Sequence, residues 1–450
     1  MYNAYITKLT NVRPHSNADR MLLADCFGNT ICVGLDAKEG DMGIYFPTDG
    51  QLSVEYAEIN NLVRKKDENG NNIGGYLDPD KRNITAIRLR GEKSDGLFMP
   101  LTSLDYTGIN IEDLTEGTII NTVNGHEICC KYIPKRKAYN GGAPNKLGNR
   151  TRKKKLPIAP LFIEHADTEQ LAYNLNDFKI GDLVEITLKC HGTSQRTGYL
   201  PVLKGYKRSL LDKILRREGK PIYDWDYVSG TRRVVLEDFD GGYYGSNEFR
   251  EQHSKFFEGK LQKGEEVYYE VVGYTHTGAP IMGSVDNKKL QDKDFIKTYG
   301  KTTEFSYGCA PNTDSGFPQS RMLVYRMTMT NEDGYIVEYT PDYMRYRCEQ
   351  MGAEYVPVLW TGIILNNTWV NTHTAGEWIK NIAEEYYDGA DPIGKTHIRE
   401  GVVVRIVNRP KFTAYKHKNF SFKLLSGIVI QQLEDTDAIN NLSEDTLSEM

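Results

Sequence analysis

The chain has 450 residues, of which 39% are hydrophobic and 26% are charged, and it carries a formal net charge of −5. This length is too great for one small core and predicts two or three domains. No segment approaches the run of about 18 apolar residues that a membrane-spanning helix needs, and the N-terminus lacks the basic and apolar regions of a secretory signal. We therefore expect a multidomain protein of the cytoplasm.

The cysteines argue against two common kinds of cross-link. There are seven of them, an odd number, and no two form a Cys-x-x-Cys pair. A disulfide framework or a structural zinc site would need paired or clustered cysteines. We expect reduced thiols at all of these positions, which are Cys26, Cys32, Cys129, Cys130, Cys190, Cys309 and Cys348.

Residues 1–130 alternate short apolar runs with turn-forming residues. The runs include AYITKL, MLLADCFG and TICVGL. Short strands at this spacing, with Gly and Asp between them, are typical of a small closed barrel or a sandwich. We predict a β-barrel domain over this range.

Residues 131–157 have the composition of a basic linker. Ten basic residues and no acidic ones lie between Lys131 and Lys155, among Gly, Pro and Asn. There is too little apolar material to offset the entropy of ordering. Such a segment can follow a phosphate backbone, or it can be only a solvated connector. The other end of the chain has the opposite sign, since six acidic residues and no basic ones follow Leu424, and we predict an acidic tail over 431–450.

Residues 158–430 mix β-rich runs with helical stretches. The runs LVEITL, EEVYYEVVGY and EGVVVRIV are interspersed with predicted helices at 208–219 and 375–389. The second helix places Trp378, Ile379 and Ile382 on one face, as expected of an amphipathic helix on a core. Strands and helices without a regular βαβ order predict an α+β domain of antiparallel sheets flanked by helices.

Four short motifs follow one another along this domain. They are KCHG at 189–192, EVVG at 270–273, EGVVV at 400–404 and KHK at 416–418. In this order they resemble the motif series of the covalent nucleotidyltransferases, the superfamily of polynucleotide ligases and RNA capping enzymes. More narrowly, the chain resembles the ATP-dependent RNA ligases that seal nicks and carry an N-terminal OB-fold, because the stretches at 15–35 and 86–101 are similar to that domain. The resemblance covers residues 1–430.

A lysine at the end of a buried strand has a chemical use in this family. A lysine attacks phosphorus only as the neutral amine, whereas a free lysine with a pKa of about 10.4 is charged at neutral pH. Lowering that pKa by about three units costs roughly 4 kcal/mol and requires desolvation and nearby cations. The resemblance implies that Lys189, which follows the run 183–188, is the nucleophile that takes AMP from ATP.

The remaining motifs supply charge around the α-phosphate. Lys416 and Lys418 alternate with His417, so a strand would present both lysines on one face, where they can stabilise the charge that develops on phosphate oxygens. Glu270 and Glu400 offer hard oxygen ligands for Mg²⁺ or Mn²⁺. Family analogy also gives Glu270 a contact with a ribose hydroxyl.

Four further residues are candidates for binding the nucleotide. His191 stands where most of the superfamily has aspartate, although a phage-type branch has KxHGT; it is either a hydrogen-bonding residue near the α-phosphate or a packed structural histidine. Gly192 leaves room for a phosphate or ribose beside the backbone. Tyr325 matches an aromatic that stacks on adenine, with a core tyrosine as the alternative. Arg232 is the better candidate in SGTRR for a ribose or 5′-phosphate contact, although the sequence does not separate it from Arg233.

Together these features predict an ATP-dependent RNA ligase of RNA repair. It would join a 3′-hydroxyl to a 5′-phosphate through a lysyl-AMP intermediate and an adenylated RNA 5′ end. The expected partners are ATP, Mg²⁺ or Mn²⁺, and a nicked duplex, broken strand or RNA–DNA hybrid, and we expect a monomer. Two alternatives stay open, a GTP-dependent capping-type enzyme, whose OB-fold would follow the catalytic domain, and a catalytically inert RNA-binding protein. The segments 275–320 and 340–395 have no role in this scheme.

Overall fold

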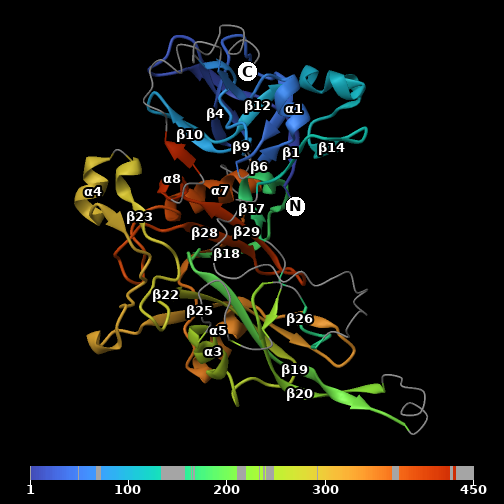
Figure 1. Cartoon of the computed structure of the whole chain (residues 1–450), viewed down its shortest axis with the longest axis vertical. Helices are drawn as coiled ribbons and strands as arrows, with labels where there is room; N and C mark the ends of the chain where they lie inside the picture. The colour runs from blue at the N-terminus through green and yellow to red at the C-terminus, as the bar shows by residue number, and fades with distance from the viewer. Residues whose placement is uncertain are drawn as a thin grey trace. The chain divides into compact units, whose positions relative to one another are not determined.

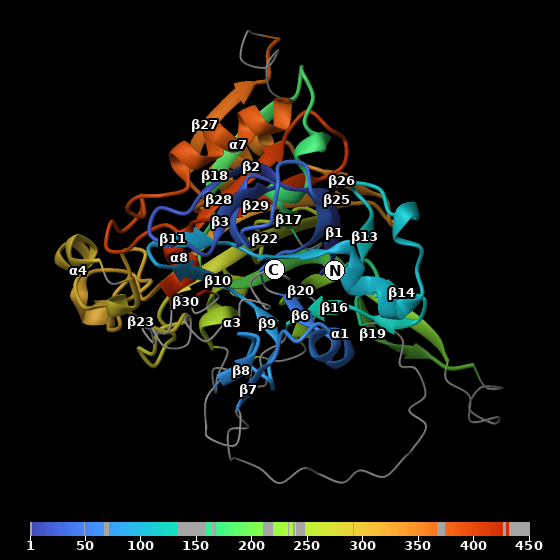
Figure 2. The same ribbon diagram turned by 90° about the horizontal axis from the view of Figure 1, so that it is seen from above.

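The chain folds into two compact units, shown in Figures 1 and 2. Unit 1 comprises residues 1–142, 289–291 and 423–450, and unit 2 comprises residues 143–288 and 292–422. The computed structural model describes residues 2–48, 50–66, 72–132, 158–163, 165, 168–209, 219–232, 234–236, 239, 248–290, 292–366, 374–425 and 429–431. Residues 210–218 of the predicted helix, most of the basic linker, residues 432–450 of the acidic tail and Arg233 lie outside these residues.

Unit 1 is built from short strands, mostly in antiparallel pairs. Its largest sheet has the order β12–β5–β1–β13 and contains β1 (Ala4–Lys8), β5 (Met42–Phe46), β12 (Leu97–Pro100) and β13 (Ile119–Ile120). One three-stranded sheet contains β2 (Thr10–Pro14), β3 (Leu22–Cys26) and β4 (Asn29–Val33). A second has the order β16 (Cys129–Lys131), β6 (Gly50–Leu52) and β9 (Asn83–Ile84). A third has the order β11 (Glu92–Ser94), β10 (Ala86–Leu89) and β30 (Val429–Gln431). Smaller pairs join β7 (Arg64–Lys66) to β8 (Asn72–Gly74) and β14 (Thr122–Val123) to β15 (His126–Glu127).

The described strands of unit 1 form separate small sheets and not one closed barrel. The predicted barrel is therefore not confirmed, although the predicted strand-rich character is. The described strands of this unit have two to five residues, and helix α1 (Val54–Ile59) lies between β6 and β7. A core that includes Ile6, Phe46 and Tyr56 holds the unit together.

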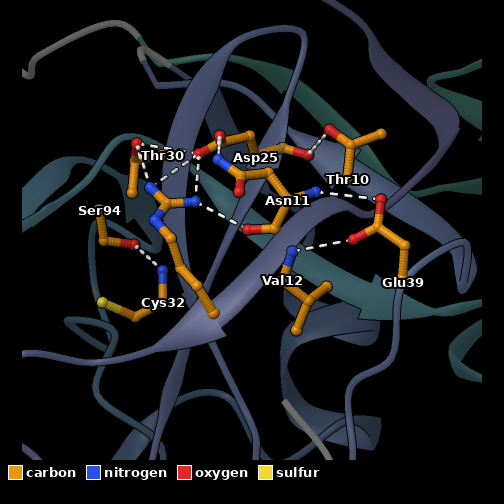
Figure 3. Close-up of polar contacts among 9 residues, drawn as sticks. Thr10, Asn11, Val12, Asp25, Thr30, Cys32, Glu39 and Ser94 are labelled. Carbon is orange, nitrogen blue, oxygen red and sulfur yellow. Dashed lines mark hydrogen bonds and ion pairs between the residues drawn. The ribbon is translucent and has the colours of Figure 1, made fainter.

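Side chains stabilise the irregular strand β2, as Figure 3 shows. Its register against β3 shifts between Thr10 and Arg13, and Asn11 has a left-handed φ of 53°. The Glu39 carboxylate accepts hydrogen bonds from the backbone N–H groups of Asn11, at 3.1 Å, and Val12, at 2.9 Å. These bonds replace the ladder partners that a bulge removes.

Unit 2 contains two larger sheets. The five-stranded sheet has the order β17–β29–β28–β18–β27, with β17 (Glu169–Gln170), β29 (Thr413–Lys418), β28 (Gly401–Ile406), β18 (Leu183–Leu188) and β27 (Val358–Ile363). The six-stranded sheet has the order β21–β20–β19–β22–β25–β26, with β21 (Val235–Leu236), β20 (Lys220–Gly230), β19 (Thr193–Lys207), β22 (Glu265–Gly273), β25 (Ser320–Thr330) and β26 (Ile336–Glu338). A two-stranded pair joins β23 (Val285–Asp286) to β24 (Thr302–Thr303).

Helices cover these sheets as amphipathic patterns predict. Helix α7 (Ala375–Tyr386) matches the predicted helix and buries Ile379 and Ala383 against Val184 and Ile186 of β18. Helices α3 (Glu248–Lys255) and α5 (Pro341–Met351) pack on the six-stranded sheet through residues that include Phe249. Two further α-helices among the described residues are α4 (Lys293–Tyr299) and α8 (Phe420–Leu425). The α+β class of mostly antiparallel sheets is confirmed.

The end of the described chain belongs to unit 1, whereas the sequence predicted one catalytic domain that continues to residue 430. β30 pairs in parallel with β10, with Val429 opposite Ala86. Lys423 Nζ lies 2.6 Å from Asp95 Oδ2, a pair that is largely buried. Neither contact has a local signal in the sequence.

The structure also bears on disulfide bonds and membrane-spanning helices. All seven cysteines are free thiols. Within the described ranges, no helix combines the length and the apolar character that crossing a membrane requires.

Candidate active site

Strand β18 delivers Lys189 to a cavity in unit 2. Val184 and Ile186 are buried in the core beneath α7, while Glu185, Thr187 and Lys189 line the cavity. This alternation is the period of a strand with one face on the core. The backbone N–H of Lys189 donates to the carbonyl of Gly401 at 3.0 Å, so the nucleophile candidate is tied to the start of β28.

The cavity has a volume of about 280 Å³, near the lower end of the range for small-molecule sites. Six of the predicted site residues line it, namely Lys189, Arg232, Glu270, Tyr325, Lys416 and Lys418. They come from segments more than 200 residues apart in sequence. The fold therefore brings together most of the motifs that the sequence singled out.

Glu400, directly before β28, is surrounded by positively charged side chains. Its Oε1 lies 2.7 Å from Lys189 Nζ and 3.3 Å from Lys418 Nζ, and only 3% of its side chain is exposed. Burial alone would raise the pKa of this carboxyl, but Lys189, Lys418 and His191 hold the pKa well below its usual range. Glu400 is therefore ionised at neutral pH and lies within ion-pair distance of two lysines.

The KHK motif alternates as predicted. Lys416 and Lys418 both line the cavity, whereas His417 lies 3.4 Å from Glu384 and stacks on Tyr387 at a ring distance of 5.0 Å. β29 pairs with β28, with Lys416 opposite Val403. Both lysines thus belong to the same wall as Lys189.

Glu270 enters the cavity from β22 in the other sheet, opposite Ser194 of β19. Burial raises its pKa to about 7; the charge of Lys189 opposes this rise, and the charge of Glu400 adds to it. Glu270 lines the cavity, whereas Glu400 contacts Lys189 and Lys418 without being among the lining residues, and the pKa values of these two carboxyl groups are shifted in opposite directions. Such a split is a feature of functional sites.

Tyr325 and Arg232 lie on the same wall as Glu270. The Tyr325 hydroxyl is 3.2 Å from that of Ser194, and its ring centroid is 5.6 Å from that of His165. Arg232 is exposed, and its charge favours the ionised form of Glu270. An aromatic face and a cation thus line one cavity together.

His191 and Gly192 are not among the residues that line the cavity. The His191 ring packs edge-on against Phe305 and Phe422, and its Nδ1 lies 3.6 Å from Glu400 Oε2. A Cβ on Gly192 would meet the carbonyl oxygen of Val271 at 2.4 Å, so glycine is needed here for the close approach of β19 to β22. These placements favour packing over the direct nucleotide contacts that the sequence predicted.

Cys190 is buried beside Lys189, and burial raises the pKa of its thiol well above the usual range. A buried thiol of this kind is unreactive and packs as a small hydrophobic group.

Sequence reasoning missed Arg250 of α3. Its guanidinium donates to the carbonyl of Ser194 at 3.2 Å and to the hydroxyl of Thr193, and Gln195 Nε2 donates to the Arg250 carbonyl at 2.9 Å. Arg250 thus anchors the start of β19, directly after the nucleophile loop. No motif marks it, because the contact depends on how α3 packs.

The sequence also missed the ion pair at the other end of β18. Glu185 lines the cavity and lies 2.8 Å from Arg345, which lines it as well. The strand that ends at Lys189 therefore also presents a paired carboxylate inside the same cavity.

The two glutamates fit a divalent cation. Across the described residues no group of three or more His, Cys, Asp or Glu side chains could hold a metal ion by itself. Glu400 Oε2 is nevertheless buried without a hydrogen-bond partner among those residues. Mg²⁺ is commonly bound by one or two carboxylates together with water and substrate phosphates, which is the donor set that this cavity can offer.

Comparison with known proteins gives one kind of match. No protein family's sequence profile matches the chain, and no curated protein sequence does. Solved structures of an RNA ligase do match over nearly the whole chain. That protein is the RNA ligase of Naegleria gruberi: its structure with pyrophosphate has a TM-score of 0.55 and 17% sequence identity, and the match covers 93% of this chain and 97% of that one.

Two further structures of the same ligase agree. A lysine-to-alanine mutant with ATP and Mn has a TM-score of 0.54 at 16% identity, covering 95% of this chain and 98% of that one. A lysine-to-methionine mutant with AMP and Mn has a TM-score of 0.54 at 16% identity, covering 93% and 97%. The chain therefore has the fold of this RNA ligase.

Proposed function

We propose that the chain is an ATP-dependent RNA ligase that acts through a lysyl-AMP intermediate. The observation that carries this proposal is the position of Lys189, 2.7 Å from the buried Glu400 in a cavity that also contains Lys416 and Lys418. A lysine nucleophile beside fixed cations is what nucleotidyl transfer to an amine requires. The fold shared with an RNA ligase supports the same assignment.

The reaction has three steps at one site. Lys189 Nζ first gives up its ammonium proton to solvent; its lone pair then attacks the α-phosphorus of ATP, a P–N bond forms, the P–O bond to pyrophosphate breaks, and a second proton leaves the nitrogen. A 5′-phosphate oxygen of RNA then attacks the same phosphorus, and the P–N bond breaks as the nitrogen takes up a proton and leaves as the amine. A 3′-hydroxyl finally attacks the RNA 5′-phosphorus, a phosphodiester forms, AMP leaves, and the hydroxyl proton passes to solvent.

The cavity residues have separate roles in this scheme. Lys416 and Lys418 stabilise negative charge on the phosphate oxygens. Glu270 and Glu400 would hold Mg²⁺ or Mn²⁺, which supplies positive charge at the phosphates when it is bound, and Glu270 would also contact a ribose hydroxyl. Tyr325 stacks on adenine, and Arg232 contacts ribose or a 5′-phosphate. His191 and Gly192 act on the nucleotide through the shape of the loop that carries Lys189.

Unit 1, as an OB-fold-like domain, and the basic segment 131–157 would hold the RNA. The natural substrate in this proposal is a nicked duplex or a broken strand met in RNA repair, and the enzyme works as a monomer. The ten basic residues between Lys131 and Lys155 are opposite in charge to an RNA phosphate backbone, which supports this role.

The first test is covalent labelling with ATP or GTP that carries a labelled α-phosphate, in the presence of Mg²⁺ or Mn²⁺. We expect label from ATP on the wild-type protein and on a Cys190→Ala control, and none on Lys189→Ala. Label from GTP alone would favour capping chemistry. Absence of label with both nucleotides, on protein stripped of AMP by pyrophosphate, would favour an inert RNA-binding protein.

A second test separates RNA binding from nucleotide chemistry. Replacement of Arg152, Lys153, Lys154 and Lys155 by serine in the full chain should leave lysyl-AMP formation unchanged. Sealing should weaken and become less dependent on salt, because fewer counterions are released on binding. Unchanged sealing at both low and high salt would contradict the role of the basic segment.

A further inference from the structure

Five aromatic rings form a continuous buried cluster directly behind the candidate site. His191 packs edge-on against Phe305 at 4.7 Å and against Phe422 at 4.8 Å. Phe305 contacts His397 at 5.3 Å, and His397 contacts Tyr307 at 4.5 Å, both also edge-on. We call these residues the five-ring cluster. Edge-to-face geometry fixes the orientation of each ring relative to the next.

Tyr307 is the constrained member of the cluster. It is 1% exposed, and its backbone has a left-handed φ of 50°, a conformation that costs energy for a bulky side chain and collects at functional sites. In this conformation its hydroxyl accepts a hydrogen bond from the backbone N–H of His191 at 2.6 Å. Tyr307 therefore holds the main chain two residues after Lys189.

A second loop fixes the Tyr307 turn from the opposite side. Gly394 lies so close that a Cβ there would meet the backbone nitrogen of Gly308 at 2.4 Å. The Gly394 N–H in turn donates to Asp391 Oδ2 at 2.5 Å. Neither loop can move without the other, because backbone packs directly against backbone.

The same loop leads to Glu400. His397 is completely buried, with Nδ1 2.9 Å from the carbonyl of Ile398 and Nε2 4.0 Å from Asp391 Oδ2. Glu400 follows three residues later. The cluster thus holds the chain on both sides of the Lys189–Glu400 pair, through His191 on one side and His397 on the other.

This arrangement is more polar than packing alone would select. Among the described residues, Asp391 Oδ1, His397 Nε2 and Glu400 Oε2 are buried side-chain atoms without a hydrogen-bond partner. Burying such groups destabilises a fold relative to an apolar core. A function that depends on their geometry would account for the cost.

We propose that the five-ring cluster positions the Lys189–Glu400 pair for attack, and that Tyr307 and His397 are positioning residues of the reaction. This inference rests on the proposed ligase function. It also gives a role to parts of the segments 275–320 and 340–395, which the sequence left unassigned. The cluster does not touch the nucleotide in this proposal, so its loss should slow the chemical step and leave nucleotide affinity unchanged.

The test is single-turnover formation of the lysyl-AMP adduct by the full chain over a range of ATP concentrations. Tyr307→Phe removes only the hydroxyl that accepts from His191, and we expect the maximal rate constant to fall about tenfold, with the apparent KM for ATP within twofold. The matched control is Tyr269→Phe, because Tyr269 is equally buried and its hydroxyl is 2.9 Å from that of Thr197, outside the cluster. The control should keep the wild-type rate within twofold and melt at a similar temperature.

His397→Gln provides a second variant if Tyr307→Phe does not fold, and the same separation of rate and KM is expected. Maximal rates equal to that of Tyr269→Phe in both variants would overturn the proposal. A change confined to KM, or loss of folding in both variants, would also overturn it. Failure of the proposed function has a different signature: the wild-type protein itself would form no Lys189-dependent adduct. The inference would then fail as well, because it rests on that function.

Discussion

The two sheets of unit 2 give the cavity two different walls. The five-stranded sheet contributes Lys189, Lys416 and Lys418 around Glu400, whose pKa is held below its usual range. The six-stranded sheet contributes Glu270, whose pKa burial raises to about 7. The same kind of side chain is thus ionised on one wall and able to take up a proton near neutral pH on the other.

This difference separates two tasks. A wall with three lysines and a carboxylate that is ionised at neutral pH can neutralise a phosphate and hold Lys189 in place. A wall whose carboxyl titrates near pH 7 can change charge when a cation or a nucleotide arrives. Opposite pKa shifts of neighbouring carboxyl groups commonly mark such a division of roles.

Removing the charge of Glu400 should have the largest effect. Glu400→Gln leaves Lys189 and Lys418 without their carboxylate, and we expect lysyl-AMP formation to fall by about a thousandfold or more. Single-turnover labelling would measure it, with Glu349→Gln on the exposed side of α5 as a control for the same change. Equal rates in the two variants would show that the charge of Glu400 has no role in lysyl-AMP formation.

Replacing a lysine of β29 should have the second-largest effect on lysyl-AMP formation. Lys416→Ala or Lys418→Ala should lower adenylation about a hundredfold, because each removes a fixed cation from the charged wall. His417→Ala changes the residue between them, which faces Glu384 outside the cavity, and should lower the rate less than about threefold. A larger loss in His417→Ala than in its neighbours would show that the wrong face of β29 had been assigned to the site.

The other wall predicts a dependence of stability on pH. The pKa of Glu270 is raised from 4.5 to about 7 in the folded state. The native protein therefore binds more protons than the unfolded chain between these values, and Glu270 destabilises the fold increasingly as pH rises through that window. Glu270→Gln should be more stable than wild type at pH 8 by about 3 kcal/mol at most, and nearly equal at pH 4.5.

Urea unfolding at both pH values, without divalent metal, measures this difference. The same gap at pH 4.5 and pH 8 would mean that Glu270 does not titrate between them. An added cation should close the gap at pH 8 by stabilising the ionised wild-type carboxylate.

The smallest effect on stability is expected for Glu384, which contacts His417 outside the cavity. The pKa of Glu384 is lowered to about 2, because His417 and Lys380 outweigh the effect of burial. Its contribution to stability is therefore present above pH 4.5 and is lost as pH falls toward 2. Because the pair is partly exposed, Glu384→Gln should cost less than about 1 kcal/mol at pH 7. Thermal melting measures the cost, and adenylation at the wild-type rate would confirm that this contact lies outside the site.

The sequence predicts the parts of the site that depend on local periodicity. The apolar run 183–188 is β18, with the bounds Leu183–Leu188. The alternation in KHK places Lys416 and Lys418 in the cavity. Strand parity and motif order are properties of neighbouring residues, so they can be recognised without knowing how the chain packs.

The sequence does not predict what depends on packing between distant segments. Arg250 reaches the nucleophile loop from α3, and Tyr307 reaches it through a left-handed turn. For His191 the sequence leaves open a position near the phosphate or a packed structural role, and the contacts of its ring with Phe305 and Phe422 depend on distant segments. The predicted barrel of unit 1 likewise stays unconfirmed, because strand length and spacing do not specify which strands pair.

The parallel pairing of β30 with β10 has a consequence for synthesis of the chain. β10 has β11 on one side and β30 on the other, and β30 lies at residues 429–431. A nascent chain that has emerged only as far as unit 2 therefore presents β10 with an open edge, which is a site for wrong pairing with another chain. The sheet of unit 1 is completed only after residues 429–431 have left the ribosome.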